Sequence, residues 1–285
     1  MVSAGGPEDL PPSERFDRMR PGNSGADCRG SDACQVFPFV EYRQVEMKQL
    51  GRWLAAGAGA VAAAAGTPVV AAPAYAAPCP DVEVVFARGT FEPPGIGATG
   101  QAFVDALRAR LPDRTVQDYA VNYPASLDFA TAAAGVIDAS NRVMTTAANC
   151  PDTETVVGGF SQGAAVAAYI TADAIPQGYT PPPGMTGPMP ADVADHVAAV
   201  ALFGKPSSGF LQMIYTGAPP ITVGSRYESK TVDLCIPEDP VCSPGGGDNG
   251  AHGAYAVRGL TDQAADYVVA ELTGNPQPVD QAAGG

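Results

Sequence analysis

The stretch Thr155-Val156-Val157-Gly158-Gly159-Phe160-Ser161-Gln162-Gly163 decides the fold. A short run rich in β-branched residues leads into a serine that has a glycine two residues away on either side, and an alanine-rich segment follows at once. Such a turn is so tight that larger side chains in place of the glycines would collide, and the serine hydroxyl then stands clear of the sheet. The stretch therefore predicts a strand at 155–159, a nucleophilic Ser161 and a helix over 162–174.

Strands and helices alternate on both sides of this turn. Short β-branched or apolar runs predict further strands at 82–87, 115–121, 197–203 and 231–234. Apolar residues at helical spacing predict helices around Phe103, Leu107 and Leu111, over 128–148 and over 261–273. This alternation predicts an α/β fold in which a central, mostly parallel sheet is covered on both faces, a three-layer αβα sandwich.

Composition excludes several classes of protein. The chain has 285 residues, 46% of them hydrophobic, which is enough to bury a sizeable core. Sixteen basic residues against 30 acidic ones give a formal net charge of −14, so a nucleic acid would be repelled and is not an expected partner. There is no C-x-x-C pair and there are only two histidines, so neither a metal nor another cofactor is expected.

A possible export signal lies inside the chain. Met47 is followed by Lys48 and Arg52, then by the uncharged run 53–70 and the small-residue stretch Ala74-Tyr75-Ala76, which is typical of a signal peptide and its cleavage site. We therefore interpret 47–76 as a signal peptide, and we expect a secreted protein. An even number of cysteines, six, agrees with disulfides formed in an oxidising compartment.

The other parts of the chain follow from that interpretation. We interpret residues 1–46 as a non-native or disordered extension, 77–274 as the catalytic domain and 275–285 as a flexible tail. Two alternatives remain open: a transmembrane anchor at 53–77, and a genuine cytoplasmic extension closed by a Cys28–Cys34 bridge. After export no stable insertion into a membrane is expected, because the mature chain stays strongly acidic.

A serine nucleophile requires a base, and the two histidines are the candidates. His252 lies in a glycine-rich loop after the last predicted strand, whereas His196 directly precedes a strand and fits a histidine satisfied by solvent or backbone. The acid that orients the base falls between serine and histidine in the chain order of α/β-hydrolases. Among the carboxylates that satisfy this order, the candidates are Asp233, Glu238, Asp239 and Asp248.

Several motifs together resemble the cutinase family of serine esterases, over about residues 79–272. Cys235-Ile236-Pro237-Glu238-Asp239-Pro240-Val241-Cys242 resembles the family's short disulfide loop that carries the catalytic aspartate, and His252 follows it after a glycine-rich stretch. Ala87-Arg88-Gly89-Thr90 resembles the motif after the first strand that helps to build the oxyanion hole. Asn122-Tyr123-Pro124-Ala125 and Leu202-Phe203-Gly204-Lys205-Pro206 are also similar to family signatures.

The resemblance implies a role for each matching residue. Ser161 would attack the ester carbonyl, His252 would carry the proton, and Asp239 would orient the imidazole. The Gln162 amide and Thr90 would form the oxyanion hole. Disulfides Cys79–Cys150 and Cys235–Cys242 are also implied. Glu238 stands where many relatives have glycine, so a second carboxylate lies beside the expected acid.

The same resemblance predicts how substrate reaches the serine. No long amphipathic insert lies between Ser161 and His252, and residues 176–190 hold too many prolines for a helical lid. We expect an open, shallow groove, walled by Tyr123, Pro124 and Tyr255 and by the apolar Leu211 and Ile214. The expected substrate is a small-molecule, lipid or polyester ester with a short to medium acyl chain, bound by a monomer. An acetylxylan esterase, a lipase or phospholipase, and a catalytically silent binding protein are the alternatives.

Overall fold

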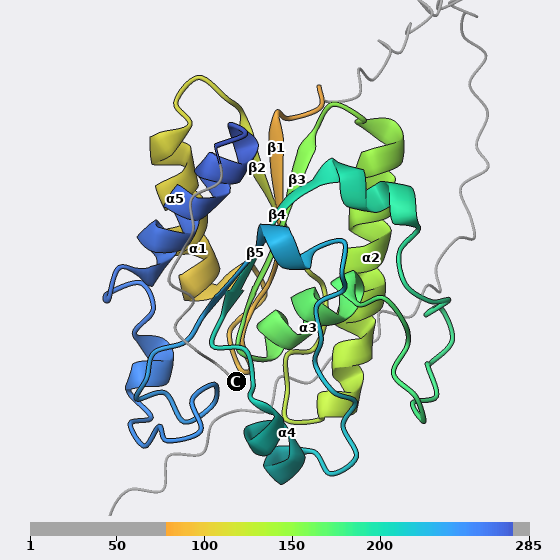
Figure 1. Ribbon diagram of the computed structural model, residues 1–285, viewed down its shortest axis with the longest axis vertical. Coiled ribbons are helices and arrows are strands. Elements are labelled where there is room, and N and C mark those ends of the chain that lie inside the picture. The colour runs from red at the N-terminus through yellow and green to blue at the C-terminus, as the bar shows by residue number, and fades with distance from the viewer. Residues whose placement is uncertain (1–77, 276–285) are drawn as a thin grey trace, which may run out of the picture. The chain divides into compact units, whose positions relative to one another are not determined.

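The computed structural model of the chain describes residues 78–275, and these form one parallel sheet with helices on both faces (Figure 1). The five strands lie in the order β2-β1-β3-β4-β5, and every neighbouring pair is parallel. Their bounds are β1 Val82–Ala87, β2 Val116–Ala120, β3 Glu154–Phe160, β4 Val197–Phe203 and β5 Thr231–Leu234. The central strands β1, β3 and β4 are buried on both sides of the sheet, as parallel sheets require, which confirms the predicted three-layer α/β sandwich.

Two pairs of helices cover the two faces (Figure 1). Helices α1 and α5 pack together on one face, and α2 and α3 pack together on the other. Each pair closes its own hydrophobic core against the sheet, with Phe86, Phe103 and Phe203 in contact under the first pair. The helices are α1 Gly97–Arg110, α2 Ala132–Asn149, α3 Gln162–Thr171, α4 Ser208–Ile214 and α5 Leu260–Leu272, with short 3₁₀ turns at Phe129–Thr131, Ala191–His196, Glu228–Lys230 and Ala251–Gly253.

The predicted elements are present, with small shifts at their ends. Strands β1, β4 and β5 have the predicted bounds. The predicted helix over 162–174 ends at Thr171, because Ala172 is already extended and Thr171 O accepts a hydrogen bond from Gly224 N at 3.0 Å. Helix α4 was not predicted from the sequence; it is short, and Ser207 caps it by accepting a hydrogen bond from Phe210 N at 3.3 Å.

Both glycines of the serine turn are required by close backbone approaches. A Cβ at Gly159 would lie 2.1 Å from the carbonyl oxygen of Gly163, and a Cβ at Gly163 would lie 1.9 Å from that of Ala87. Ser161 itself has a φ of 55°, a left-handed conformation that costs about 1–3 kcal/mol for a residue with a side chain. The strand, the turn and the helix can therefore come this close only with glycine at these positions.

Two disulfides lie in the described part of the chain. Cys79–Cys150 joins the segment before β1 to the end of α2, and Cys235–Cys242 closes a short loop after β5, which are the implied pairings. Among residues 78–275 no helix is long and apolar enough to cross a bilayer. Several predictions concern residues outside the described part of the chain. They are those for residues 1–46, for residues 47–76, for the tail beyond Asn275 and for a bridge between Cys28 and Cys34.

Candidate active site

Ser161 lies where β3 ends and α3 begins, at the carboxyl edge of the sheet. Its backbone N–H donates to the carbonyl of Phe203 at the end of β4, at 2.9 Å, and its own carbonyl accepts the first hydrogen bond of α3, from Ala164 N at 2.9 Å. Sheet and helix thus fix the backbone on both sides of the residue. The hydroxyl faces a cavity, of which Ser161 is a lining residue.

His252 comes from the 3₁₀ turn Ala251–Gly253 and lies directly against this hydroxyl. Its Nε2 atom is 2.8 Å from Ser161 Oγ, and its Nδ1 atom is 2.8 Å from Asp239 Oδ2. The imidazole ring rests on the Phe160 ring, with 4.9 Å between the ring centroids. A serine, a histidine and an aspartate separated by up to 91 positions in the chain therefore form one continuous hydrogen-bonded series.

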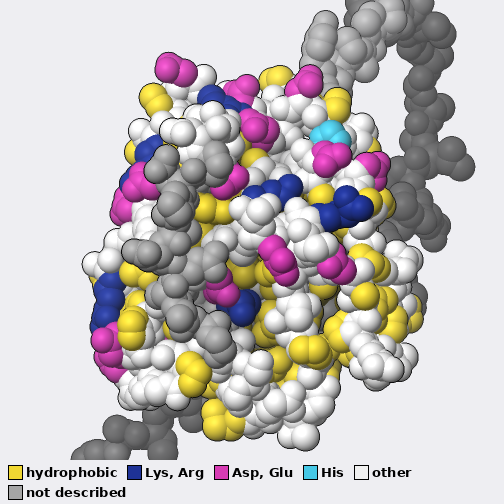
Figure 2. Space-filling view, viewed as in Figure 1, with side chains coloured by type: hydrophobic (Ala, Val, Ile, Leu, Met, Phe, Trp, Pro, Cys, Tyr) yellow, Lys and Arg dark blue, Asp and Glu magenta, His cyan; other side chains and the backbone are white. Residues whose placement is uncertain are grey.

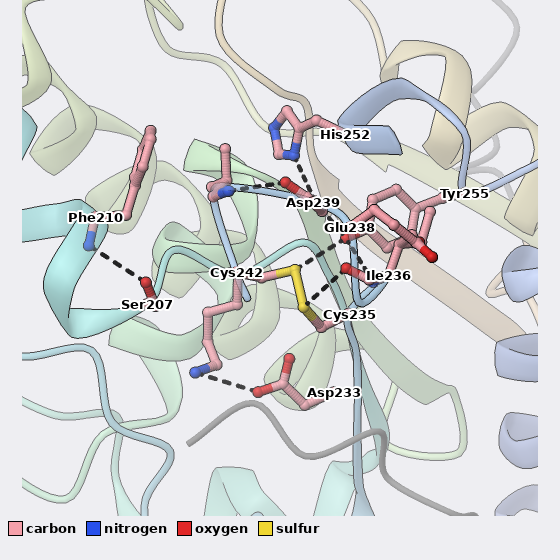
Figure 3. Close-up of a disulfide and its surroundings, with 12 residues drawn as sticks. Ser207, Phe210, Asp233, Cys235, Ile236, Glu238, Asp239, Cys242, His252 and Tyr255 are labelled. Atoms are coloured by element: carbon pink, nitrogen blue, oxygen red, sulfur yellow. Dashed lines mark hydrogen bonds and ion pairs between the residues drawn. A yellow bond between two sulfur atoms is a disulfide. The ribbon is translucent and has the colours of Figure 1, made fainter. Parts of the chain in front are cut away.

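Asp239 is completely buried and accepts hydrogen bonds on both carboxylate oxygens (Figure 3). Oδ2 accepts from His252 Nδ1 and from the Tyr255 hydroxyl at 2.7 Å, and Oδ1 accepts from Val241 N at 2.8 Å. Burial by itself would raise the pKa of Asp239, but the hydrogen bonds from His252, Tyr255 and Val241 outweigh it and lower this pKa. The carboxylate is therefore ionised and can only accept, which fixes a proton on Nδ1 and leaves Nε2 free to act as a base.

The other candidate carboxylates are occupied elsewhere. Asp233 pairs with Lys205 at 3.2 Å on β5, and burial raises its pKa (Figure 3). Glu238, although next to Asp239, points outward to Arg258 at 2.8 Å, and Asp248 accepts from Gly250 N at 2.8 Å. Of these four candidates, only Asp239 faces the imidazole.

His196 lies far from the serine turn. It ends the 3₁₀ turn before β4, and its Nδ1 atom is 3.2 Å from the backbone carbonyl of Pro151. This end of β4 is the amino edge of the sheet, opposite the edge that carries Ser161. The preference for His252 as the base is in agreement with these positions.

Thr90 and Gln162, the expected oxyanion-hole residues, both line the cavity that Ser161 faces. The side chain of Gln162 is turned away, donating to the Ser126 carbonyl at 3.0 Å, which leaves its backbone N–H at the start of α3. Thr90 is held by its neighbours, because Glu92 accepts from Gly89 N at 2.6 Å and the buried Arg88 donates to the backbone of Glu92 and Tyr123. Arg88 and Glu92 are supports for which the sequence motif gave no separate signal.

Backbone strain is concentrated around the serine. Within residues 78–275 only Phe91, Ala125 and Ser161 are non-glycine residues with positive φ. Phe91 N donates to Ala125 O at 2.8 Å, so the two loops that carry these residues are tied together beside the turn. Strain of this kind persists only where the surrounding structure holds it in place, and functional sites are where it gathers.

The cavity has a volume of about 530 Å³, and part of its wall differs from the wall expected for the substrate groove. Leu211 and Ile214 line it as predicted. Tyr123, Pro124 and Tyr255 do not, and this part of the prediction is corrected by the structure. Residues of the proline-rich segment after α3 take their place in the wall.

The two tyrosines are unavailable to a ligand for a physical reason. Tyr255 is fully buried beneath His252, and its hydroxyl is used by Asp239. Tyr123 is only 4% exposed and donates its hydroxyl to the Arg88 carbonyl, with the Arg88 guanidinium over its ring. Pro124 is exposed outside the cavity. Both tyrosines thus support the site from behind. Among residues 78–275 no three His, Cys, Asp or Glu side chains are grouped so that they could hold a metal ion.

A parallel sheet of this order, with a serine at a strained turn after its central strand and a histidine and an aspartate on the loops beyond, defines an α/β-hydrolase. The family model named Cutinase matches residues 78–272. Carboxylesterase Culp1 of Mycobacterium tuberculosis is 48% identical over 200 residues, which cover 70% of this chain and 85% of that protein. The chain therefore belongs to the cutinase family, whose members are carboxylic-ester hydrolases.

Further relatives agree with this assignment. Phospholipase Culp4 of M. tuberculosis is 44% identical, and the match covers 78% of this chain and 96% of that protein. A cutinase from Trichoderma reesei, solved in complex with a phosphonate inhibitor, is 32% identical with a TM-score of 0.50, covering 68% of this chain and 78% of the other. A solved acetylxylan esterase, at 23% identity and a TM-score of 0.54, covers 68% of this chain and all of its own, and it shares the fold.

Proposed function

We propose that this protein is a serine esterase that is secreted and that hydrolyses carboxylic esters with apolar acyl groups through an acyl-enzyme. The observation that carries the proposal is the hydrogen-bonded series from Ser161 through His252 to Asp239, with 2.8 Å at each step, at the wall of an apolar cavity. Each group in it has the chemistry that its position requires: a half-buried hydroxyl at the cavity wall, an imidazole with one free nitrogen, and a buried carboxylate.

In the first half-reaction Ser161 Oγ attacks the ester carbonyl carbon while its proton moves to His252 Nε2. Asp239 stabilises the imidazolium that forms, and the negative oxygen of the tetrahedral intermediate is held by the Gln162 N–H and the Thr90 hydroxyl. The intermediate collapses, the bond to the alcohol oxygen breaks, and His252 gives its proton to the departing alcohol. The acyl group stays on Ser161.

In the second half-reaction water takes the place of the alcohol. His252 accepts a proton from the water as it attacks the acyl-serine, and the same two donors hold the oxygen of the second intermediate. When this intermediate collapses, the proton returns to Ser161 Oγ and the carboxylic acid leaves. The enzyme is then in its starting state, with no group consumed except water.

Two of the relatives bear on the substrate class. One is named a carboxylesterase and another a phospholipase. The cavity beside Ser161 is lined mainly by Ala, Val, Ile, Leu, Met, Phe and Pro, which favours an aliphatic acyl group over a sugar. We therefore place lipid-like esters ahead of acetylated xylan.

Hydrolysis of dissolved esters tests this function. We expect p-nitrophenyl esters to be cleaved below their micelle threshold, with no jump in rate when the threshold is crossed, because α4, the only α-helix of the described chain between α3 and His252, has seven residues and is too short to form a long amphipathic lid. An abrupt rise at the threshold would identify a lidded lipase instead. A strict preference for acetyl groups on xylan would identify an acetylxylan esterase, and absence of turnover on every ester would point to a binding protein.

Secretion rests on the stretch 47–76 and is supported by two disulfides. We expect N-terminal sequencing of protein recovered outside the cells to begin near Ala77, because Ala74 and Ala76 provide the small residues that signal peptidase recognises. A control in which Ala74 and Ala76 are both replaced by Lys is expected to stop processing. A secreted chain that still begins at Met1 would contradict the proposal.

A further inference from the structure

The cavity beside Ser161 extends along two helices, away from the serine. Its wall includes Gln162, Ala165, Tyr169 and Ala172, which follow each other at helical spacing through and just past α3. Helices that connect parallel strands run antiparallel to them, so α3 leads from the carboxyl edge of the sheet toward the amino edge. The cavity therefore has one end at the hydroxyl and runs back along the helix.

Helix α2 provides a second wall with the same direction. The lining residues Ala133, Ile137, Asn141 and Met144 lie on one face of it at helical spacing. The start of α2 is near the serine, because the carbonyl of Ser126 shortly before it accepts the hydrogen bond from the Gln162 side chain. Both walls thus begin at the catalytic end.

The wall formed by α2 is firmly attached to the sheet. Glu83 of β1 is 1% exposed, pairs with Arg142, and accepts from the Thr146 hydroxyl at 2.5 Å. Separating a buried carboxylate from its partners strongly destabilises a folded protein. Because Arg142 and Thr146 lie on α2, their contacts with Glu83 hold this helix in one position on the sheet. The distance between the two ends of the channel is therefore a fixed property of the fold.

The third side is the segment 174–190, called the roof here. It holds six prolines and no charged residue. Met185 and Met189 pack against the core under α2 and α3, and a side chain added at Gly184 would touch Ile137 at 3.6 Å. On the right of Figure 2, hydrophobic side chains gather over this segment, which hangs beside α2 in Figure 1.

The roof is held by apolar packing alone. Within the described residues its hydrogen bonds are made to itself, such as Tyr179 N to Pro176 O and Met185 N to Pro182 O, and to the 3₁₀ turn that follows it. No ion pair or hydrogen bond would have to break for a ligand to slide beneath it. Flexible methionines suit such a cover, because they adapt to an apolar guest.

The two walls give the same length. From Ala133 to Met144 the helix rises about 16 Å, and from Gln162 to Ala172 about 15 Å, at about 1.5 Å per residue. A fully extended polypeptide advances about 3.5 Å for every three backbone bonds, and an extended alkyl chain advances by a similar length per bond. A channel of this length therefore accepts an acyl chain of about 12 to 14 carbons. The walls are mainly apolar over this length, with Ser140 and Asn141 as the polar lining residues of α2, and no Lys or Arg is among the lining residues to bind a charged group at the far end.

We propose that the space between α2, α3 and the roof is an acyl-chain channel that selects esters of about 12 to 14 carbons. This deepens the proposed esterase function and rests on it. The carbonyl lies at Ser161, the alkyl chain lies along Ile137 and Tyr169, and its end reaches Met144. Affinity rises with each methylene buried until the channel is full, and longer chains gain nothing further.

Tryptophan substitutions along α2 test whether the length of the channel determines the preferred acyl length. For wild-type protein we expect kcat/KM on dissolved p-nitrophenyl esters to rise at least tenfold from 4 to 12 carbons. Ile137→Trp closes the channel about 6 Å from Ala133 along the helix, so it is expected to lower the ratio of dodecanoate to butyrate hydrolysis at least tenfold. Met144→Trp is expected to affect only chains longer than about 10 carbons.

Ala134→Trp is the matched control, because Ala134 is exposed on the same helix and does not line the cavity. It is expected to keep the wild-type chain-length profile. An unchanged profile in both Ile137→Trp and Met144→Trp, or a wild-type optimum at 4 carbons or fewer, would overturn the channel while leaving the esterase function in place.

Binding without turnover separates the two proposals and covers a variant that fails to fold. Calorimetric titration of the Ser161→Ala protein with dodecanoate is expected to show saturable 1:1 binding at least tenfold tighter than that of butyrate. If wild-type protein cleaves no ester while Met144→Trp still weakens dodecanoate binding, the channel is supported and the esterase function is refuted. Equal affinity for the two acids would refute the channel.

Discussion

Ser161→Ala is expected to lower kcat for p-nitrophenyl esters by about 10⁶-fold, the loss typical when the nucleophile of such a triad is removed. The reason is chemical, since the attacking oxygen is deleted while His252, Asp239 and the oxyanion donors remain. Labelling by an organophosphate should disappear together with activity. The melting temperature should change little, because the hydroxyl lies at the cavity wall and the strained backbone is held by its neighbours.

Ser229→Ala is a suitable control for this variant. Ser229 is exposed in the 3₁₀ turn before β5, at the edge of the sheet opposite the site. It is expected to have wild-type kcat and full labelling. Retained organophosphate labelling in Ser161→Ala would show that another residue is the nucleophile.

Asp239→Asn is expected to lower kcat by about 10⁴-fold with little change in KM. Three donors converge on this carboxylate, from His252, Tyr255 and the Val241 backbone. An asparagine amide has one acceptor oxygen, so its NH₂ group must face one of these donors. If it faces His252, the imidazole takes the wrong tautomer and Nε2 carries a proton where it must accept one.

Glu238→Gln is the matched control for the neighbouring carboxylate. Glu238 pairs with Arg258 on the surface, and exposed pairs of this kind contribute about 0–1 kcal/mol. We expect kcat within about twofold of wild type and an unchanged pH profile. A larger loss in Glu238→Gln than in Asp239→Asn would reverse the assignment of the acid.

Local patterns identified the parts of the site that depend on neighbouring residues. The turn around Ser161 was predictable because its glycines, its β-branched strand and its helix are contiguous in the sequence. His252 was preferred to His196 because it follows the last strand and therefore lies near the carboxyl edge. The acid could be placed only by order or by resemblance, because several carboxylates fit the order and their directions depend on contacts with distant residues such as Arg258 and Lys205.

Tyr255 illustrates why the substrate wall was partly misassigned. A tyrosine three residues after the histidine was expected to face the ligand, but it is turned inward, where its hydroxyl meets Asp239 and its ring packs on Phe160 and Phe203. Burial of a large ring with a satisfied hydroxyl stabilises this orientation. No pattern within the chain distinguishes the two directions of such a side chain.

The sequence by itself determined the parallel α/β sandwich, the serine turn and the histidine that serves it, because strand alternation and tight turns are set by neighbouring residues. The tertiary structure alone decided which carboxylate meets His252, that Tyr123 and Tyr255 lie behind the site, and that residues 174–190 form part of the wall of the cavity beside Ser161. Those features arise where α2, α3 and the segment after α3 pack together, and the packing of residues far apart in the chain follows from the whole core.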